Sequence, residues 1–294
     1  QKKILLALDG SDNAFETVKY VSRITPFKKM RIVLFNVFNK IPDSYWDMER
    51  QPNVGRRVRE VQIWEMQNEK IMKEYMEKAR QKLLASGFPH NNVQVKIHKR
   101  KSGIARDIIM EAKRDYSAVA VSRKGISKLR GLVLGSVTNK LLVNLDFVPL
   151  FVVGKTTRPE RFLLCIDGSG GAKRAVDYVG SILNGSDYEV NLTHVIREEE
   201  KQYIGEAEIN IGAVFDYAKT RLIDSGINPN QINTQIITEV KSRAGAIVKE
   251  AKQGGYGTIV VGRRGISNVP DFFMGRVSNK VVHLSSGNTV WVVH

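Results

Sequence analysis

Cysteine is nearly absent from this chain of 294 residues: Cys165 is the only one, and it stands in a short apolar run. A disulfide framework within one chain is therefore excluded, which fits a reducing compartment. We interpret Cys165 as a small buried hydrophobe. No apolar run approaches the length of a membrane span, and 42% of the residues are hydrophobic, as in globular proteins. We expect a cytoplasmic protein.

Several catalytic signatures are also missing. The five histidines show no metal-ligand spacing. No Gly-x4-Gly-Lys-(Ser/Thr) loop occurs, so no P-loop enzyme is indicated. Neither a carboxylate pair nor a nucleophile beside a base stands out. These absences favour a binding role over catalysis.

Acidic residues are scarce in the first half of the chain. Residues 1–154 contain 29 Lys and Arg against 15 Asp and Glu, so they carry most of the net charge of +16. The excess includes a cluster at Arg56, Arg57 and Arg59 and the run 99–101. Such a surface is either merely solvated or attracts polyanions: nucleotide phosphates, nucleic acid or an anionic membrane face.

Short apolar runs alternate with amphipathic segments, in an order that the second half repeats. Strands are predicted at 3–8, 31–38, 93–98, 117–121, 150–153, 162–166, 189–196, 232–238, 258–261 and 289–293. Helices are predicted at 13–24, 56–86, 103–113, 136–145, 172–183, 206–225, 243–252 and 277–284. Residues 40–55 look like a loop. The pattern predicts two tandem α/β domains, 1–154 and 160–294, each with a five-stranded parallel sheet in three layers.

One loop motif occurs twice, each time after an apolar strand and before a helix. The first copy is Ser122-x2-Gly125-x9-Gly135-Ser136, and the second is Gly262-x2-Gly265-x9-Gly275-Arg276. An Asp-Gly-Ser step follows the first strand of each half, at Asp9 and at Asp167. Glycines let a ligand approach the backbone, and a helix N-terminus supplies free N–H groups and a positive dipole end. Both motifs therefore predict phosphate binding at the carboxyl edge of a sheet.

These residues resemble the fingerprint of the universal stress protein family, which is Gly-x2-Gly-x9-Gly-(Ser/Thr) together with an Asp after the first strand. The whole chain resembles two such domains in tandem. The resemblance implies a flavodoxin-like (adenine nucleotide alpha hydrolase-like) fold with strand order 3-2-1-4-5. It also implies ATP as the ligand, with or without Mg²⁺. Other members of the family lack the glycines and do not bind ATP.

The resemblance assigns roles to individual positions. Asp9 and Asp167 would bond the nucleoside, and Val37 or Val195 would line the adenine. The glycines and the Gly-Ser step would hold the phosphates. In the first copy, Val137 and Thr138 follow Ser136 in the helix and complete the expected site.

The two copies depart from the fingerprint in different ways. Ser122 replaces the first glycine; if that position needs positive φ or a close ligand, serine costs about 1–2 kcal/mol or blocks the contact. Ser136 could be both N-cap and phosphate ligand. In the second copy Arg276 stands where the fingerprint has Ser, and it either meets a phosphate or closes the site. Ser278 could supply the missing hydroxyl.

The leading hypothesis is an ATP-binding stress-response protein with a regulatory rather than a catalytic role. One alternative is a slow ATPase or phosphoryl-transfer protein. Another is binding of nucleic acid or an anionic membrane by the basic first half. We also expect the two domains to pair as a pseudo-twofold unit through the apolar strands 150–153 and 289–293, and association of two chains stays open.

Overall fold

The computed structural model of the chain describes residues 1–38, 55–125, 133–156, 158–199, 204–265 and 274–294, without the side chains of 55–59 and 204–210. The predicted loop at 40–55 lies outside these residues except for Gly55, which begins a helix. Parts of both glycine loops, 126–132 and 266–273, lie outside them as well. The residues that flank each loop are described.

Within the described residues, each half forms the strands and helices that its sequence predicts, in the predicted order. The first half contains β1 (Lys3–Ala7), α1 (Asp12–Arg23), η1 (Thr25–Lys29), β2 (Arg31–Phe38), α3 (Gly55–Ala85), η3 (His90–Asn92), β3 (Val93–Lys99), α4 (Ile104–Ala112), β4 (Ala118–Ser122), α5 (Ser136–Asn144) and β5 (Leu150–Val153). The second half contains β6 (Arg161–Cys165), α6 (Gly170–Leu183), β7 (Glu189–Arg197), α7 (Ile204–Asp224), η5 (Pro229–Gln231), β8 (Ile232–Val240), α8 (Arg243–Gln253), β9 (Thr258–Gly262), α9 (Arg276–Leu284) and β10 (Thr289–Val293).

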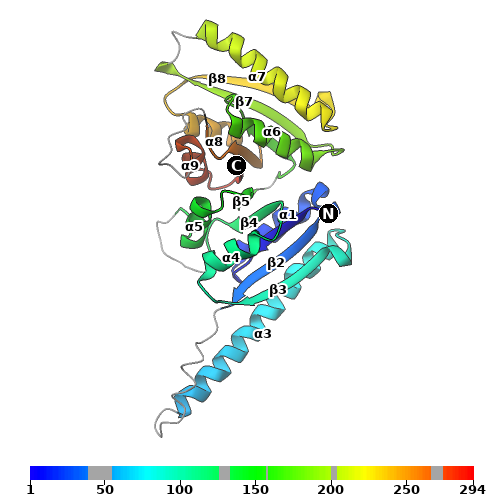
Figure 1. Cartoon of the computed structure of the whole chain (residues 1–294), viewed down its shortest axis with the longest axis vertical. Coiled ribbons are helices and arrows are strands. Elements are labelled where there is room, and N and C mark those ends of the chain that lie inside the picture. Colours follow the sequence, from blue (N-terminus) through cyan, green and yellow to red (C-terminus); the bar gives the residue numbers. More distant parts are fainter. Residues whose placement is uncertain (39–54, 126–132, 157, 200–203, 266–273) are drawn as a thin grey trace.

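The ten strands form one continuous sheet in the order β3-β2-β1-β4-β5-β10-β9-β6-β7-β8 (Figure 1). Within each half the pairs are parallel, and the order is the predicted 3-2-1-4-5. The strand order reverses between β1 and β4, and again between β6 and β9. In parallel α/β sheets a ligand crevice lies at that point, beyond the carboxyl ends of the strands.

Helices cover both faces of the sheet because each presents one apolar stripe. In α1 the buried residues Ala14, Thr17, Val18 and Val21 recur at helical spacing. The core on that face also receives side chains from α3, α6 and α7. The core on the opposite face is built with α4, α5, α8 and α9.

The two halves are joined by antiparallel pairing of β5 with β10, which confirms the predicted contact between the last strands. Phe151 lies opposite Trp291, and their rings stack with centroids 4.2 Å apart. Trp291 is fully buried, and its indole Nε1 donates to the hydroxyl of Tyr20 at 3.0 Å. A residue of α1 in the first half thus holds a core residue of the second half.

On the other face, two buried arginines connect the halves reciprocally. Arg263, which follows β9, donates to the carbonyls of Leu142, Val143 and Leu145 at 2.7, 2.9 and 2.8 Å, at the end of α5. Arg123, which follows β4, donates to the carbonyl of Val282 at the end of α9. Both guanidiniums meet the negative end of a helix dipole. Each half therefore caps the last helix of the other.

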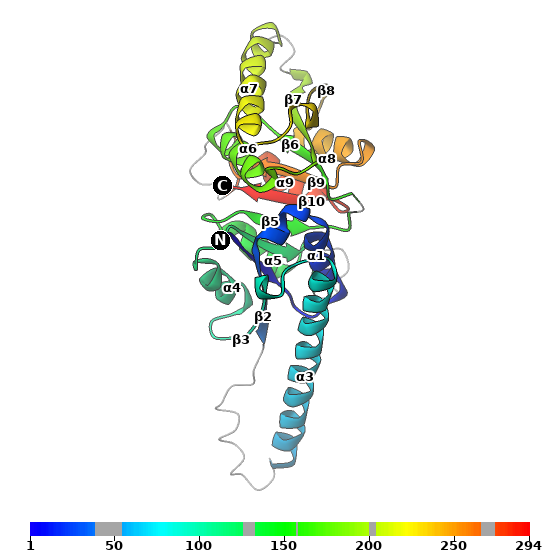
Figure 2. The same cartoon turned by 90° about the vertical axis from the view of Figure 1, so that its right-hand side faces the viewer.

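The long helix α3 extends beyond the body of the first half (Figures 1 and 2). Its C-terminal part packs on the sheet through Met76, Ala79 and Leu83, all fully buried. In its N-terminal part Trp64 and Ile71 expose 55% and 61% of their surface. The apolar residues of this amphipathic helix therefore pack against the sheet only in its last turns.

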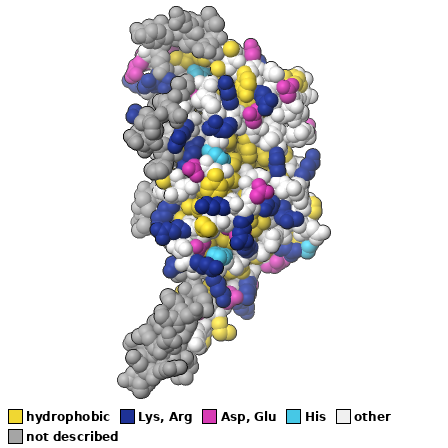
Figure 3. All heavy atoms as spheres, in the orientation of Figure 1, with side chains coloured by type: hydrophobic (Ala, Val, Ile, Leu, Met, Phe, Trp, Pro, Cys, Tyr) yellow, Lys and Arg dark blue, Asp and Glu magenta, His cyan; other side chains and the backbone are white. Residues whose placement is uncertain are grey.

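Lys and Arg side chains are spread over the described part of the face shown in Figure 3. Lys99, Arg100 and Lys101 are exposed where β3 ends. The side chains of the predicted basic cluster at 56–59 lie outside the described ones. Among the helices described, none is long and apolar enough to cross a bilayer.

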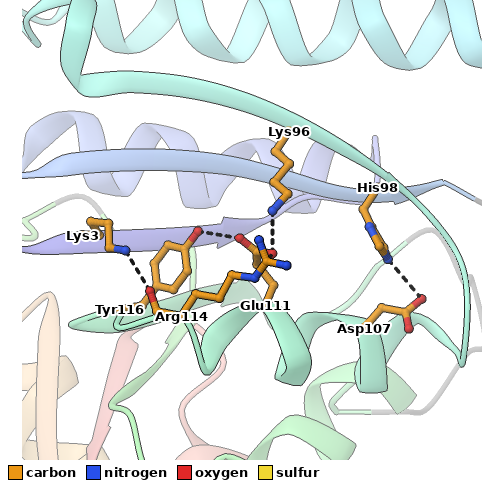
Figure 4. Close-up of polar contacts among 7 residues, drawn as sticks. All are labelled: Lys3, Lys96, His98, Asp107, Glu111, Arg114 and Tyr116. Carbon is orange, nitrogen blue, oxygen red and sulfur yellow. Dashed lines mark hydrogen bonds and ion pairs between the residues drawn. The ribbon is translucent and has the colours of Figure 1, made fainter.

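A buried carboxylate connects α4 with the sheet beneath it (Figure 4). Glu111 accepts hydrogen bonds from Lys96 of β3 at 2.7 Å and from the hydroxyl of Tyr116 at 2.9 Å. Burial raises the pKa of Glu111, but these hydrogen bonds and the charges of Lys96 and Arg114 outweigh it, so that its pKa is lowered overall. The charged form of Glu111 is therefore the stabilised one.

Candidate functional site

A cavity of about 350 Å³ lies at the carboxyl ends of β6, β7 and β9, against the first turns of α8 and α9. All predicted site residues of the second half line it: Asp167, Val195, Gly262, Gly265, Gly275 and Arg276. Segments separated by more than a hundred residues therefore meet at one place. The volume lies in the range of small-molecule sites.

The turn after β6 holds Asp167 in a fixed orientation. Its Oδ1 accepts from the backbone N–H of Ser169 at 3.0 Å. Ser169 is the N-cap of α6, and its hydroxyl accepts from the N–H of Ala172 at 3.1 Å. Gly168 has a φ of +77°, a conformation that glycine adopts without strain. The Asp-Gly-Ser step thus begins a helix and aims a carboxylate at the cavity.

The motif glycines provide space and do not supply positive φ, since none of those described has it. A Cβ on Gly265 would lie 2.7 Å from Oδ2 of Asp167. A Cβ on Gly262 would lie 2.5 Å from the carbonyl carbon of Gly171 in α6. The first motif glycine therefore lets β9 approach α6, and the second makes room for the carboxylate.

The first turn of α9 corrects the expectation for Ser278. Gly275 is the N-cap of this helix, and Arg276 is its first helical residue. The hydroxyl of Ser278 donates to the carbonyl of Gly262 at 2.6 Å. This hydrogen bond connects the helix to the end of β9. Because the hydroxyl proton is used there, Ser278 does not supply the phosphate donor that the motif lacks at Arg276. The N–H groups at the start of α9 are available instead.

Positive charge gathers at this cavity. Arg243, Arg264 and Arg276 line it, and Asp167 is the only carboxylate among the described lining residues. The guanidinium Nε of Arg243 donates to the carbonyl of Val195 at 3.2 Å, which fixes the start of α8 against the end of β7. Sequence reasoning did not identify Arg243 or Arg264 as site residues. In the sequence, Arg243 is marked only by the start of a predicted helix, and Arg264 only by the glycine motif in which it stands.

Two further residues that could react or hydrogen-bond, Cys165 and His194, line the cavity. Cys165 lies at the end of β6, is partly buried and faces the cavity. Burial and the nearby Asp167 raise the pKa of its thiol. His194 holds its ring through Nδ1, which donates to the carbonyl of Ile166 at 2.7 Å. The ring of His194 also borders the cavity.

The first half repeats much of this scaffold. Oδ1 of Asp9 accepts from the N–H and the hydroxyl of Ser11, at 3.0 and 2.6 Å. A Cβ on Gly125 would overlap Oδ2 of Asp9, and Gly135 packs against the backbone from Arg123 to Gly125. The aspartate and glycines of the first motif are therefore brought together as they are in the second.

Ser122 is buried and its hydroxyl donates to the carbonyl of Lys124 at 2.8 Å. The position does not require positive φ, so a strand-end serine is tolerated. Gly135 is the N-cap of α5, so the capping role expected of Ser136 is wrong. Arg123 is buried against α9, as its counterpart Arg263 is buried against α5. Among the described residues, Ser136 stands where the second motif has Arg276.

The remaining predicted residues of the first half lie near the same edge. Ser136 is exposed at the start of α5 and Val137 follows it. Thr138 is buried, and its hydroxyl donates to the carbonyl of Ser122 at 2.9 Å. Val37 lies near the end of β2 and packs on the core beneath α4 and α5. Thr138 thus plays the part that Ser278 plays in the second half.

Comparison with known proteins agrees with this architecture. The model of the universal stress protein family matches residues 1–153 and again 159–294. Universal stress protein YxiE of Bacillus subtilis is 27% identical over 144 residues, which are 43% of this chain and 94% of YxiE.

Two solved structures are similar along nearly the whole chain. A universal stress protein from Archaeoglobus fulgidus has a TM-score of 0.64 at 22% identity, covering 99% of this chain and 97% of that one. A functionally unknown protein from Pseudomonas aeruginosa has a TM-score of 0.55 at 13% identity, covering 99% and 92%. At these identities the likeness concerns the fold. Because the family model matches both halves, the chain belongs to the universal stress protein family and carries two of its domains in tandem.

Proposed function

We propose that the second domain binds an adenine nucleotide in the cavity between Asp167 and the first turn of α9. The observation that carries this proposal is the polarity of the cavity, which has one carboxylate and three arginines in its lining. A nucleotide has the matching polarity, because its nucleoside end donates hydrogen bonds and its phosphate end is anionic. The role is regulatory binding within a stress-response family.

The phosphates would lie at the N-terminus of α9. Backbone N–H groups that a helix leaves unpaired at its start, together with its dipole, attract anions. Arg264 and Arg276 border the same space and are suited to phosphate oxygens. Of the two accounts of Arg276, phosphate contact is therefore the one we adopt. Asp167 would accept from the ribose, and Val195 would lie against the adenine.

The described residues fit ATP better than a protein-bound metal. No group of three or more His, Cys, Asp or Glu side chains suited to a metal occurs among them. Mg²⁺ would therefore enter with the phosphates. Asp167 is held by the N–H of Ser169 and lies against Gly265, at the nucleoside end. Its place there supports binding in preference to hydrolysis.

The first domain would be the weaker site. Its aspartate and glycines are arranged alike, but Ser136 and Ile104 stand where the second domain has Arg276 and Arg243. Among the described residues, fewer cations then stand at the phosphate end. We also propose a cytoplasmic location, for which the single cysteine is the support.

A matched pair of variants tests both the proposal and the assignment to one domain. ATP with Mg²⁺ should bind the wild-type chain in calorimetry. Arg276→Glu should weaken that binding at least tenfold, because a carboxylate would repel the phosphates. Ser136→Glu makes the corresponding change in the first domain and should leave the tighter site intact. Absence of ATP binding to the wild-type chain contradicts the proposal.

Cys165 provides a second measurement at the same place. It is the only cysteine, it borders the cavity, and its raised thiol pKa makes its reaction slow. ATP with Mg²⁺ should slow its labelling by methyl methanethiosulfonate further. GTP at equal concentration is the control for base recognition. Equal labelling rates with and without ATP would place the nucleotide elsewhere.

A further inference from the structure

A second cavity, of about 550 Å³, lies between α6 and α7 on the opposite face of the sheet from the arginines. It meets the first cavity at Ile166, Asp167, Ala172 and His194, which border both. Most of the described residues that line it are apolar. Apolar sites of this size with a few polar groups are the usual form of small-molecule pockets.

The first domain fills the corresponding space with aromatic side chains. Phe15 of α1 packs edge to face on Tyr75 of α3, with ring centroids 5.9 Å apart. The hydroxyl of Tyr75 donates to the carbonyl of Ser11 at 3.0 Å, across the gap between helix and turn. A Cβ on Gly10 would lie 2.9 Å from Cε of Met72. Phe15, Met72 and Tyr75 thus pack together beside the turn that carries Asp9. In the second domain the turn is approached by Val214, which would lie 3.1 Å from a Cβ on Gly168.

Aligning the two domains shows how the second cavity opens. The Ser-Gly steps at Ser86 and Ser225 end α3 and α7 and place Val214 at the position of Tyr75. The Asp-Gly-Ser steps likewise place Lys173 at the position of Phe15. Two aromatic side chains are therefore replaced by a smaller and by a flexible one. The second domain therefore has a cavity at this place because its sequence differs from that of the first domain at these two positions.

The polar groups at this cavity are also rearranged. In the first domain Lys78 of α3 lies over the ring of Phe15, at 5.3 Å. In the second the partners are exchanged, and Lys173 of α6 lies over the ring of Tyr217 of α7, at 5.2 Å. The ammonium group thus moves to α6, the helix that follows the turn carrying Asp167. A cation and an aromatic ring now stand at one rim of an apolar cavity.

His194 gives the cavity a second polar feature. Since Nδ1 donates to a carbonyl, the other ring nitrogen of the neutral side chain is a hydrogen-bond acceptor. The first domain has Asn36 at this position, and its amide nitrogen makes the corresponding bond to the carbonyl of Leu8, at 2.7 Å. Asn36 is buried, whereas His194 is partly exposed and borders both cavities.

We propose that the cavity between α6 and α7 is a ligand site of the second domain, distinct from the nucleotide site beside it. Its ligand is a small apolar molecule, aromatic or aliphatic, with one acidic group. The apolar body lies between the two helices and the acidic group pairs with Lys173. His194, at the boundary, contacts both ligands.

The experiment uses the full chain and the dye 1-anilinonaphthalene-8-sulfonate, an aromatic acid whose emission rises in apolar sites. Wild type should bind one equivalent saturably. Val214→Tyr and Lys173→Phe each restore the residue of the first domain and should reduce the dye affinity at least tenfold. Lys173→Gln removes the charge alone and should weaken binding several-fold. Ile223→Tyr, at an exposed position of α7 outside the cavity, is the control and should bind like wild type.

Circular dichroism and thermal unfolding establish that each variant is folded. Because Lys173→Phe changes an exposed side chain, at least this one of the two cavity-filling variants is expected to keep its fold. Unchanged dye affinity in folded Val214→Tyr and Lys173→Phe would overturn the proposal, as would no saturable binding to wild type. Neither residue borders the nucleotide cavity, so the result does not depend on ATP binding.

Discussion

At the scale of single residues, the glycine motif provides room for other parts of the chain. In both domains the aspartate after the first strand lies over the second motif glycine, with no space for a Cβ between them. The same aspartate accepts the N–H of the serine that caps the next helix. A side chain at this glycine would therefore disturb both the carboxylate and the cap. The spacing of the motif keeps these contacts together.

Replacing Gly265 by alanine should weaken ATP binding in calorimetry and lower the free energy of unfolding by about 1–2 kcal/mol, because the new methyl group displaces Asp167. Gly212→Ala is the control. It lies in α7 with nothing within 4 Å of its Cβ, so it should stabilise by up to about 1 kcal/mol. Equal stability of the two variants in urea would contradict this account.

Glu111 predicts a dependence of stability on pH. Its folded pKa lies below the ordinary value of 4.5, so its contribution is present above that pH and is lost as pH falls through the folded pKa. Glu111→Gln should therefore lower the free energy of unfolding at pH 7 by about 1–3 kcal/mol and reduce the loss of stability below pH 4.5. Urea unfolding between pH 3 and 7 measures both. Parallel pH curves for variant and wild type would contradict it.

At the scale of elements, α5 and α9 each begin at one glycine motif and end at an arginine from the other half. Arg263 makes three hydrogen bonds of 2.7–2.9 Å at the end of α5. Arg123 makes fewer at the end of α9, and its Nη1 has no hydrogen-bond partner among the described residues. Burial lowers the pKa of Arg123 to about 10, which still leaves it charged at neutral pH. The two bridges share a design but differ in strength.

Arg263→Met should therefore destabilise the chain more than Arg123→Met. We expect a loss of about 2–4 kcal/mol for Arg263, because three carbonyls lose their charged donor. The loss of unfolding free energy for Arg123→Met should be smaller, because the charge that methionine replaces is buried with one of its nitrogens lacking a hydrogen-bond partner among the described residues. Urea unfolding at pH 7 compares them, with each variant serving as the other's control. An equal or reversed order would contradict the reciprocal-cap account.

At the scale of the whole molecule, the ten-stranded sheet makes one body from two domains. The core on each face contains residues of both halves, and Trp291 is enclosed by Phe27, Phe151 and Phe162. Separating the halves would expose this cluster and the edges of β5 and β10. The free energy of each half is therefore tied to the other.

We accordingly predict a single cooperative thermal transition, with calorimetric and van't Hoff enthalpies that agree. Trp291→Ala should lower the free energy of unfolding of the whole chain by about 3–5 kcal/mol. Scanning calorimetry measures both, and Trp64→Ala, at an exposed position, is the matched control. Two separate transitions in wild type would show that the halves unfold independently.

The sequence determined the secondary structure and the place of the glycine motifs, and its resemblance to the family implied the strand order. Apolar strand runs and helix caps such as Ser11 and Ser169 are local signals, and the doubled motif made the repeat visible. The pattern did not reveal that much of α3 projects from the body. Whether a residue is buried depends on which other segment packs against it. Trp64 and Ile71 are large apolar residues like those of the core, but they lie exposed on the projecting part of α3.

Only the tertiary structure decided what the individual site residues touch. It made Gly275 and Gly135 the N-caps, turned the hydroxyls of Thr138 and Ser278 inward, and buried Arg123 in the opposite half. It also brought Arg243 and Cys165 to the cavity. Sequence periodicity reports which face of its own element a side chain occupies. The neighbour it meets there comes from another part of the chain, so these contacts exist only once the elements have packed together.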